Sequence, residues 1–137
     1  MKIELLSAYE TNSADFFTTL KKVHASIVVD VRLHNSNQLC GFTKEGDLAY
    51  FIPTILGIPY IHDTRFAPSD SLLKSYIDHE LPFERYAKGY RGEMADKGAK
   101  DLFKESYGSN PVVVLLGTAT KKRRSHAEVL KSILEEN

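Results

Sequence analysis

Short apolar runs alternate along the chain with longer segments in which apolar residues recur every three or four positions. The short runs predict four β-strands, over residues 3–9, 26–32, 58–62 and 111–117. The last of them, PVVVLLG, is apolar on both faces, which is typical of a central strand in a parallel sheet. Strands that alternate with helical segments indicate an α/β protein.

Helical spacing follows each strand. Asn12 or Ser13 can cap the first helix by accepting a bond from a free backbone N–H group. Thr43 is expected to cap a second helix, which Pro53 would bend or end. Residues 68–69, Pro-Ser, are expected to open a third.

The fourth helix is expected to begin at Pro82, because proline suits the first turn. Its far end is hard to place, since Gly89, Gly92 and Gly98 each lower helix stability by ~1 kcal/mol relative to alanine. A final helix is expected over residues 125–135.

These elements predict a single domain over residues 1–137, with a three-layer α/β/α fold around a mainly parallel sheet of roughly four strands. Right-handed crossovers would bring the carboxyl ends of the strands to one edge, where open α/β sheets bind ligands. The segments expected at that edge are 9–13, 32–36, 62–65 and 117–126.

Composition narrows the function classes. Eighteen basic and eighteen acidic residues cancel, so a nucleic-acid partner would have to use a local patch. Cys40 is the only cysteine, which excludes an internal disulfide and a cysteine-only metal site, and we interpret it as an incidental thiol. No cleavable signal pattern and no membrane-length apolar run is present, so a cytoplasmic protein without a membrane partner is expected.

The end of the second strand carries the first candidate chemistry. Asp30 and Arg32 would point to the same face, followed by Asn35 and Ser36. One interpretation is an ion pair that fixes the loop, which the stretch taken alone favours. The other is an anion site in which Arg32 holds a phosphate or carboxylate and Asp30 orients Arg32 or accepts a proton.

Two further segments add to the second interpretation. Tyr60, His62 and Arg65 follow the third strand, and a histidine can transfer protons near neutral pH. The basic run 121–124 precedes His126 at the start of the last helix, and a free helix N-terminus favours anions. Motifs for dinucleotide binding, P-loops, zincins and α/β-hydrolases are absent from the sequence.

Three segments also resemble a known family: VVDVRLHNSNQLCGFTKEGDLAYFI, GIPYIHDTRFAPS and the aromatic-rich FERYAKGYRGEM. They are similar to the family called domain of unknown function 488, over nearly the whole chain. That family shows an Asp-Val-Arg strand end, a loop with Ser and Phe, and a Gly-Ile-x-Tyr-x-His segment. The positions that match this pattern are Asp30, Arg32, Ser36, Phe42, Tyr60 and His62.

The end of the chain departs from the family pattern. The family's last strand tends to finish in Cys, where this chain has Gly117, and its last helix starts with Cys-His-Arg. Here Ser125, His126 and Ala127 stand at that triplet, so only the His is kept. Thiol-dependent or Cys/His-metal chemistry is therefore not expected of this chain.

The leading hypothesis is a pocket at the sheet's carboxyl edge that binds a small anionic molecule, a phosphate or a nucleotide. If a reaction occurs there, hydrolysis or group transfer at a phosphate or glycosidic bond fits best. The proposed catalytic residues are Asp30, His62 and His126, and the proposed ligand-binding residues are Arg32, Asn35, Ser36, Tyr60, Arg65, Lys121 and Arg124.

Two alternatives stay open. One is a non-catalytic nucleic-acid-binding module, with basic side chains on phosphates and Tyr86 or Tyr90 stacking on bases, although both tyrosines lie at core-facing helical positions. The other is a degenerate protein-interaction domain, which exposed aromatics and an uncharged sheet edge would support. No metal is expected, and the sequence leaves the cofactor and the oligomeric state open.

Overall fold

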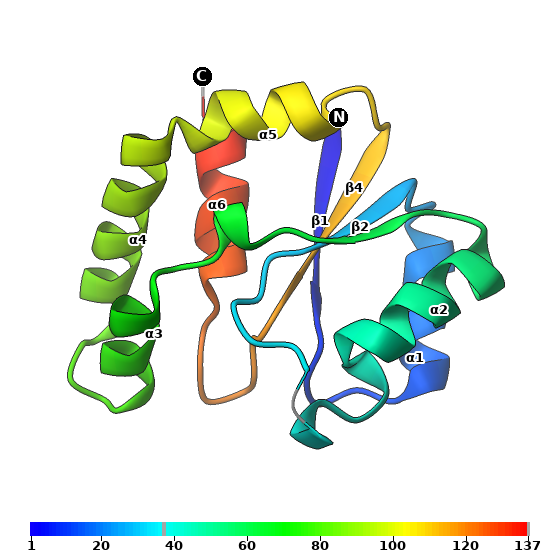
Figure 1. Ribbon diagram of the computed structural model, residues 1–137, viewed down its shortest axis with the longest axis horizontal. Helices are drawn as coiled ribbons and strands as arrows, with labels where there is room; N and C mark the ends of the chain where they lie inside the picture. The colour runs from blue at the N-terminus through cyan, green and yellow to red at the C-terminus, as the bar shows by residue number, and fades with distance from the viewer. Residues whose placement is uncertain (37, 137) are drawn as a thin grey trace.

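The protein folds around a parallel sheet of four strands in the order β1-β4-β2-β3, as the computed structural model shows for residues 1–36 and 38–136 (Figure 1). Backbone bonding in register joins each neighbouring pair, for example Val29 to Leu115 and to Ile61. The strands are β1 (Lys2–Ser7), β2 (Ile27–Asp30), β3 (Tyr60–His62) and β4 (Val112–Gly117). All four are shorter at one end or both than predicted, and β2 ends at Asp30, so Arg32 lies beyond the strand.

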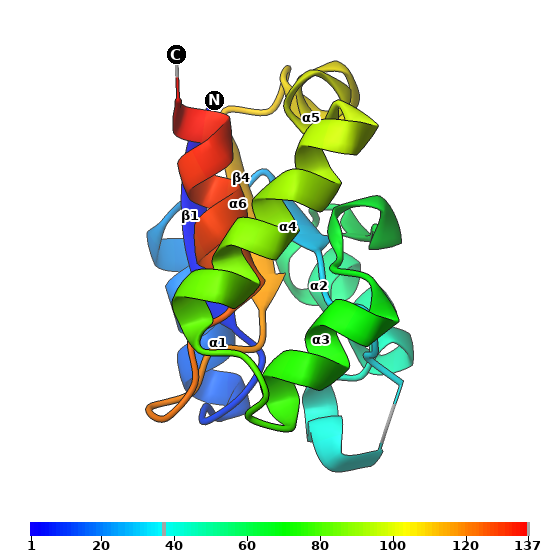
Figure 2. The ribbon, with the colours of Figure 1, turned by 90° about the vertical axis from the view of Figure 1, so that its left-hand side faces the viewer.

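Helices cover both faces of the sheet, which confirms the three-layer α/β/α prediction (Figures 1 and 2). One face packs on α1 (Ser13–Lys22) and α2 (Glu45–Leu56), through a core that includes Phe16, Leu48 and Leu116. The other face packs on a core that includes Tyr90, Phe103 and Leu115. Its helices are α3 (Asp70–Ile77), α4 (Phe83–Lys97), α5 (Ala99–Tyr107) and α6 (His126–Glu135).

Helix starts were predicted better than helix ends. Asn12, Ser69 and Ser125 cap α1, α3 and α6 by accepting bonds from backbone N–H groups, as the sequence indicates for Asn12 and Ser69. The prediction for Thr43 is wrong, because α2 starts one residue later and the buried Thr43 hydroxyl donates to the Ala8 carbonyl at 3.1 Å. A short 3₁₀ segment, η1 (Gln38–Thr43), precedes α2.

Proline and glycine interrupt the helices less than expected. Pro53 lies inside α2, which continues to Leu56. Gly92 lies inside α4, and Gly98, with φ 64°, ends that helix in the left-handed conformation that suits glycine. α5 starts directly afterwards and was not predicted, although Ala99, Phe103 and Tyr107 repeat every four residues and are buried.

No helix in the described part of the chain is long and apolar enough to cross a membrane. The interpretation of Cys40 as an incidental thiol concerns a side chain outside the described residues.

Chain connections define a crevice at the carboxyl edge of the sheet. β4 leads to α6 on one face, whereas its neighbours β1 and β2 lead to α1 and α2 on the other face. Ligands of open α/β sheets bind outside strand ends that diverge in this way. The fold therefore places residues that follow β1, β2 and β4 around one crevice.

Candidate functional site

Asp30 and Arg32 form an ion pair at the end of β2, and both side chains are fully buried. Arg32 Nε lies 2.9 Å from Asp30 Oδ1, and Arg32 Nη2 lies 2.7 Å from Asp30 Oδ2. Arg32 Nη2 also donates to the carbonyl of Thr43 at 2.6 Å, which ties the end of η1 to the end of β2. This geometry supports the interpretation as an ion pair that fixes the loop.

Two more side chains donate to the Asp30 carboxylate. The Tyr60 hydroxyl lies 2.5 Å and Asn35 Nδ2 3.0 Å from Asp30 Oδ2. Burial alone would raise the pKa of Asp30, but the hydrogen bonds and charge of Arg32, with these two donors, hold it below the usual value. Asn35 and Tyr60 thus contact Asp30, whereas the sequence placed them on a ligand.

His62 extends this network from β3. His62 Nε2 lies 2.7 Å from the Arg32 carbonyl oxygen, which can only accept, so Nε2 carries the proton. On its other side, Nδ1 lies 3.6 Å from the carboxylate of Glu45, which is 48% exposed. His62 therefore connects β3, the loop after β2 and the start of α2.

The same motif recurs after β3, where Asp63 pairs with Arg65. Arg65 Nε lies 2.9 Å from Asp63 Oδ1 and Nη2 lies 2.8 Å from Oδ2. The Tyr107 hydroxyl donates to Asp63 Oδ2 at 2.6 Å, and Arg65 also reaches Ser106 on α5. Arg65 is therefore held against α5 and does not line the crevice described next.

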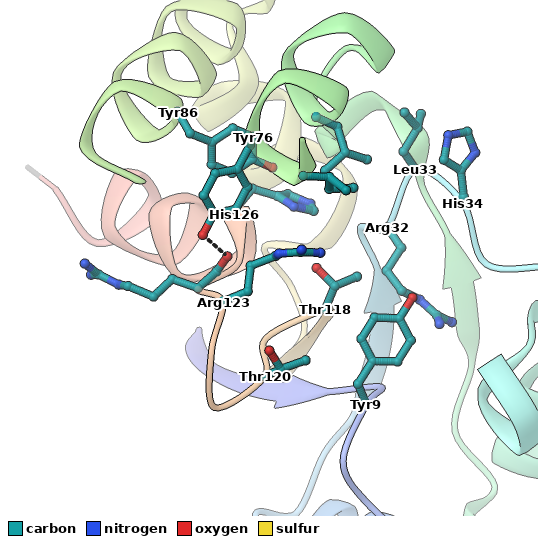
Figure 3. A pocket seen from close by; sticks show the side chains of 13 residues that line it. Tyr9, Arg32, Leu33, His34, Tyr76, Tyr86, Thr118, Thr120, Arg123 and His126 are labelled. Carbon is teal, nitrogen blue, oxygen red and sulfur yellow. Dashed lines mark hydrogen bonds between the residues drawn. The ribbon is translucent and has the colours of Figure 1, made fainter. Parts of the chain in front are cut away.

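A cavity of about 150 Å³ opens at the carboxyl edge of the sheet (Figure 3). Residues that follow β1, β2 and β4 form one side of it, and residues of α3 and α4 form the other. The lining consists of Tyr9, Arg32, Leu33, His34, Leu73, Tyr76, Ile77, Tyr86, Thr118, Thr120, Arg123, Arg124 and His126. Three of the four predicted edge segments thus contribute, and the segment after β3 does not.

His126 is 2% exposed at the base of this cavity. Its Nε2 lies 2.7 Å from the carbonyl oxygen of Val31, so Nε2 carries the proton. Burial lowers the pKa of His126 to about 4, against the opposing effects of that bond and of the Asp30 charge, so the ring is neutral at pH 7. Its Nδ1 is buried and has no hydrogen-bond partner among the described residues.

The basic run forms a tight turn between β4 and α6. Backbone bonds join Thr120 and Arg123 in both directions, at 2.9 and 3.3 Å, and the Lys121 N–H donates to Glu10 at 2.6 Å. Lys121 is exposed and does not line the cavity. Arg124 does line it, but its guanidinium forms a two-bond pair with Glu128 on α6.

Arg123 extends from this turn across the cavity towards Thr118 (Figure 3). Its guanidinium makes no hydrogen bond or ion pair in the part of the chain that the structure describes. Of the remaining predicted ligand residues, Ser36 is exposed and lies outside the lining. Within the described residues, no group of three His, Cys, Asp or Glu side chains is placed to hold a metal ion.

α3 covers the cavity without burying any of its own residues. Polar contacts hold its ends. The Ser69 hydroxyl and N–H both contact Glu93 on α4, and Asp70 lies 3.2 Å from the exposed His34. Near the other end, the Tyr76 hydroxyl donates to the Arg124 carbonyl at 2.9 Å (Figure 3).

The family model described as domain of unknown function DUF488 matches residues 12–134. The chain belongs to the DUF488 family. No curated protein and no solved structure matches the chain in the other two comparisons.

Four of the six motif positions that carry the resemblance to DUF488 lie together in the structure, whereas Ser36 is exposed and Phe42 packs against the core on the α1 side of the sheet. Asp30, Arg32, Tyr60 and His62 form one hydrogen-bonded network between β2, β3 and the loop after β2. Through the Thr43 carbonyl this network also reaches the segment before α2. These motif residues therefore hold the sheet edge in shape.

Gly117 packs closely against Ser125 and Ala127, the two residues that differ from the Cys-His-Arg pattern. A Cβ atom added to Gly117 would lie 2.7 Å from the Ser125 hydroxyl oxygen and 2.7 Å from Ala127 Cβ, closer than real Cβ atoms come. The cysteine that the DUF488 pattern has at this strand end would therefore not fit beside Ser125 and Ala127 unless they moved.

Sequence reasoning missed most of the cavity's lining. Thr118, Thr120 and Tyr76 were not named as ligand residues. Tyr86 was named only as a stacking residue in the nucleic-acid alternative, and Arg123 only as part of the basic run. In a run of four basic residues, the sequence does not show which side chain points into the cavity. The signal that was available is position, because all of 117–126 follows the central strand β4.

Proposed function

We propose that the chain binds a small molecule with an anionic group in the cavity at the carboxyl edge of the sheet, and that Arg123 contacts the anion. Among the described residues, the lining includes three arginines and no carboxylate. Asp30 neutralises Arg32, and Glu128 neutralises Arg124. The unpaired Arg123 guanidinium is the observation that carries the proposal.

The surroundings of Arg123 support an anion as the ligand. Its backbone is fixed by the two bonds to Thr120, so only side-chain freedom is lost on binding. The Thr120 hydroxyl oxygen accepts from the Lys122 N–H at 3.3 Å, which leaves its own O–H free to donate. A guanidinium beside hydroxyl donors is suited to phosphate, sulfate or carboxylate oxygens.

The proposal is one of binding, since the predicted catalytic groups contact other parts of the protein. Asp30 is fully buried among its donors, and His62 bonds to the Arg32 carbonyl. His126 bonds to the Val31 carbonyl, and its second nitrogen is covered. Hydrolase or transferase activity stays a prediction from the sequence.

The test is thermal unfolding in sodium phosphate, sodium sulfate and sodium chloride at equal ionic strength. We expect phosphate and sulfate to raise the Tm above that in chloride, and Arg123→Gln to reduce the difference to the part that comes from general exclusion of these salts from the protein surface. Lys122→Gln is the matched control, because Lys122 carries the same charge in the same turn but is exposed and outside the lining. Equal Tm values in the three salts, or an equal loss in Lys122→Gln, would overturn the proposal.

The nucleic-acid alternative depends on the exposed Lys121 and Lys122. It loses its stacking residues, since Tyr90 is fully buried and Tyr86 is 1% exposed. Oligonucleotide binding that falls steeply with salt, and that Lys122→Gln weakens more than Arg123→Gln, would favour it.

A further inference from the structure

The cavity has two halves of different chemistry (Figure 3). The polar half consists of Thr118, Thr120 and Arg123, on the segment after β4. The apolar half faces it across the opening, with α3, the start of the loop after β2, and α4. It comprises Leu33, Leu73, Ile77 and the rings of Tyr76 and Tyr86.

The apolar half is built to stay apolar. The rings of Tyr76 and Tyr86 stack at 4.1 Å with an interplanar angle of 10°. Burial raises the pKa of both tyrosines, so both rings stay uncharged at neutral pH. The Tyr76 hydroxyl is already bonded to the Arg124 carbonyl, outside the polar half. A simple inorganic anion would use the polar half and leave these surfaces without contact.

We infer that the ligand is an organic phosphate monoester with one flat apolar group, such as a single ring, joined to the phosphate. This inference rests on the proposed function, because the phosphate is the anion that Arg123 contacts. Arg123 and the two threonine hydroxyls offer donors on more than one side, which suits a tetrahedral group with three terminal oxygens. The flat group then lies against Leu73, Ile77 and Tyr76, which is the more exposed member of the tyrosine pair.

The size of the cavity limits the ligand. Its volume of about 150 Å³ is roughly ten times the ~15 Å³ that one water requires. It is about half of the ~300 Å³ at which sites for drug-sized ligands begin. A phosphate with one ring fits this range, whereas a dinucleotide exceeds it.

The base of the cavity adds no competing charge. The Arg32 side chain is fully buried in its pair with Asp30, and His126 is neutral at pH 7. The phosphate is therefore directed to the Arg123 side, and the uncharged part of the ligand to the α3 side. Arg123 and the two threonines should then control the affinity for the phosphate, and the residues of α3 the affinity for the uncharged group.

The experiment is calorimetric titration of the full chain with inorganic phosphate, phenyl phosphate and phenol at fixed ionic strength. We expect phenyl phosphate to bind roughly tenfold more tightly than inorganic phosphate, because the ring buries apolar surface. Arg123→Gln should abolish binding of both phosphates. Ile77→Ser should weaken phenyl phosphate several-fold and leave inorganic phosphate unchanged.

Ile55→Ser is the matched control for the apolar half. Ile55 is 47% exposed and Ile77 is 39% exposed, so neither change opens the core, but Ile55 lies on α2 outside this cavity. Equal affinity for both phosphates would overturn the inference and leave the proposed function standing. No binding of either phosphate would overturn the proposed function. Phenol that binds as tightly as phenyl phosphate, unchanged in Arg123→Gln, would overturn both.

Discussion

Two neighbouring strand ends carry the same Asp-x-Arg motif, and the local geometry of the two is nearly identical. In each, the aspartate Oδ1 accepts from the arginine backbone N–H at 3.2 Å and from Nε at 2.9 Å. In each, a tyrosine from elsewhere in the chain donates to Oδ2, Tyr60 to Asp30 and Tyr107 to Asp63. The two motifs differ in burial, since the side chain of Arg32 is 0% exposed and that of Arg65 is 47% exposed.

This difference shows that the Asp-x-Arg motif determines the local geometry of the pair, while its burial determines how much the pair contributes to stability. The buried pair lies between the Thr43 carbonyl and the loop after β2. Removing Arg32 would therefore leave the Asp30 carboxylate charged, unpaired by its cation and shielded from water. The outer pair keeps water around its guanidinium, which weakens its contribution. Both arginines are paired with a carboxylate, whereas the Arg123 guanidinium makes no hydrogen bond or ion pair among the described residues.

The largest expected difference is between Arg32→Gln and Arg65→Gln. Arg32→Gln leaves the buried Asp30 carboxylate without its cation, and should lower the free energy of unfolding by about 3–5 kcal/mol. Arg65→Gln breaks a partly solvated pair, and should cost about 0.2–1 kcal/mol. Urea unfolding measures both. Equal losses, or a loss below about 1 kcal/mol for Arg32→Gln, would contradict the comparison.

The second prediction concerns His126, whose ring bonds to the residue between Asp30 and Arg32 and has no counterpart at the second motif. The pKa of His126 is lowered to about 4 in the folded chain, so the unfolded chain binds more protons between pH 6.5 and 4. Stability is therefore fully present at pH 7 and falls as the pH drops through this window, by about 3 kcal/mol in total.

Urea unfolding between pH 7 and 4.5 tests this expectation. His126→Gln should be less stable than wild type at pH 7 and should lack most of the pH dependence. His34→Gln, at an exposed position, is the control and should keep it. A His126→Gln chain with the wild-type pH profile would show that the buried ring is not its source. The lowered pKa values of Asp30 and Asp63 affect stability only at lower pH, near and below about 4.

The third prediction compares Tyr60→Phe with Tyr107→Phe. Both hydroxyls donate to a buried carboxylate, at 2.5 and 2.6 Å, so each change leaves an acceptor with one donor fewer. We expect similar losses of about 1–2 kcal/mol in the free energy of unfolding. A large loss at one site and none at the other would show that the two motifs are not equivalent in this contact.

The smallest predicted effect is that of salt. Raising NaCl to 1 M reduces the Debye length to about 3 Å, so the cost of Arg65→Gln should shrink by a few tenths of a kcal/mol. The cost of Arg32→Gln should stay the same, because no solvent separates that pair. Unfolding curves at low and high salt measure this. The same salt dependence for both variants would show that salt screens the two pairs equally, which would contradict the prediction.

The fold was predictable because its signals are local. Apolar runs such as PVVVLLG identify strands, and Ser69 and Asn12 sit where their hydroxyl and amide cap helices. α5 was missed since three glycines made the preceding helix hard to end, although only Gly98 ends it.

The roles of the site residues were less predictable because they depend on distant partners. Asp30 and Arg32 could be placed together from the sequence, but the donors that surround them come from Thr43 and Tyr60. Likewise, Arg65 is held by α5, the helix that the sequence did not reveal. These long-range contacts determine which arginine side chains are already paired within the protein.

The helix α3 has a consequence for selectivity. One wall of the cavity is anchored, because Arg32 and His126 are bonded to the ends of strands and segments around the sheet. The opposite wall is α3, which has no fully buried residue. It packs through the half-buried Leu72 and the ring of Tyr76, and polar contacts hold its ends. For a ligand in this cavity, we therefore expect differences in shape to be accommodated by α3 more than by the sheet edge. Under the proposed function, the turn that carries Arg123 would select the charged group, and α3 would set how wide a range of attached groups is tolerated.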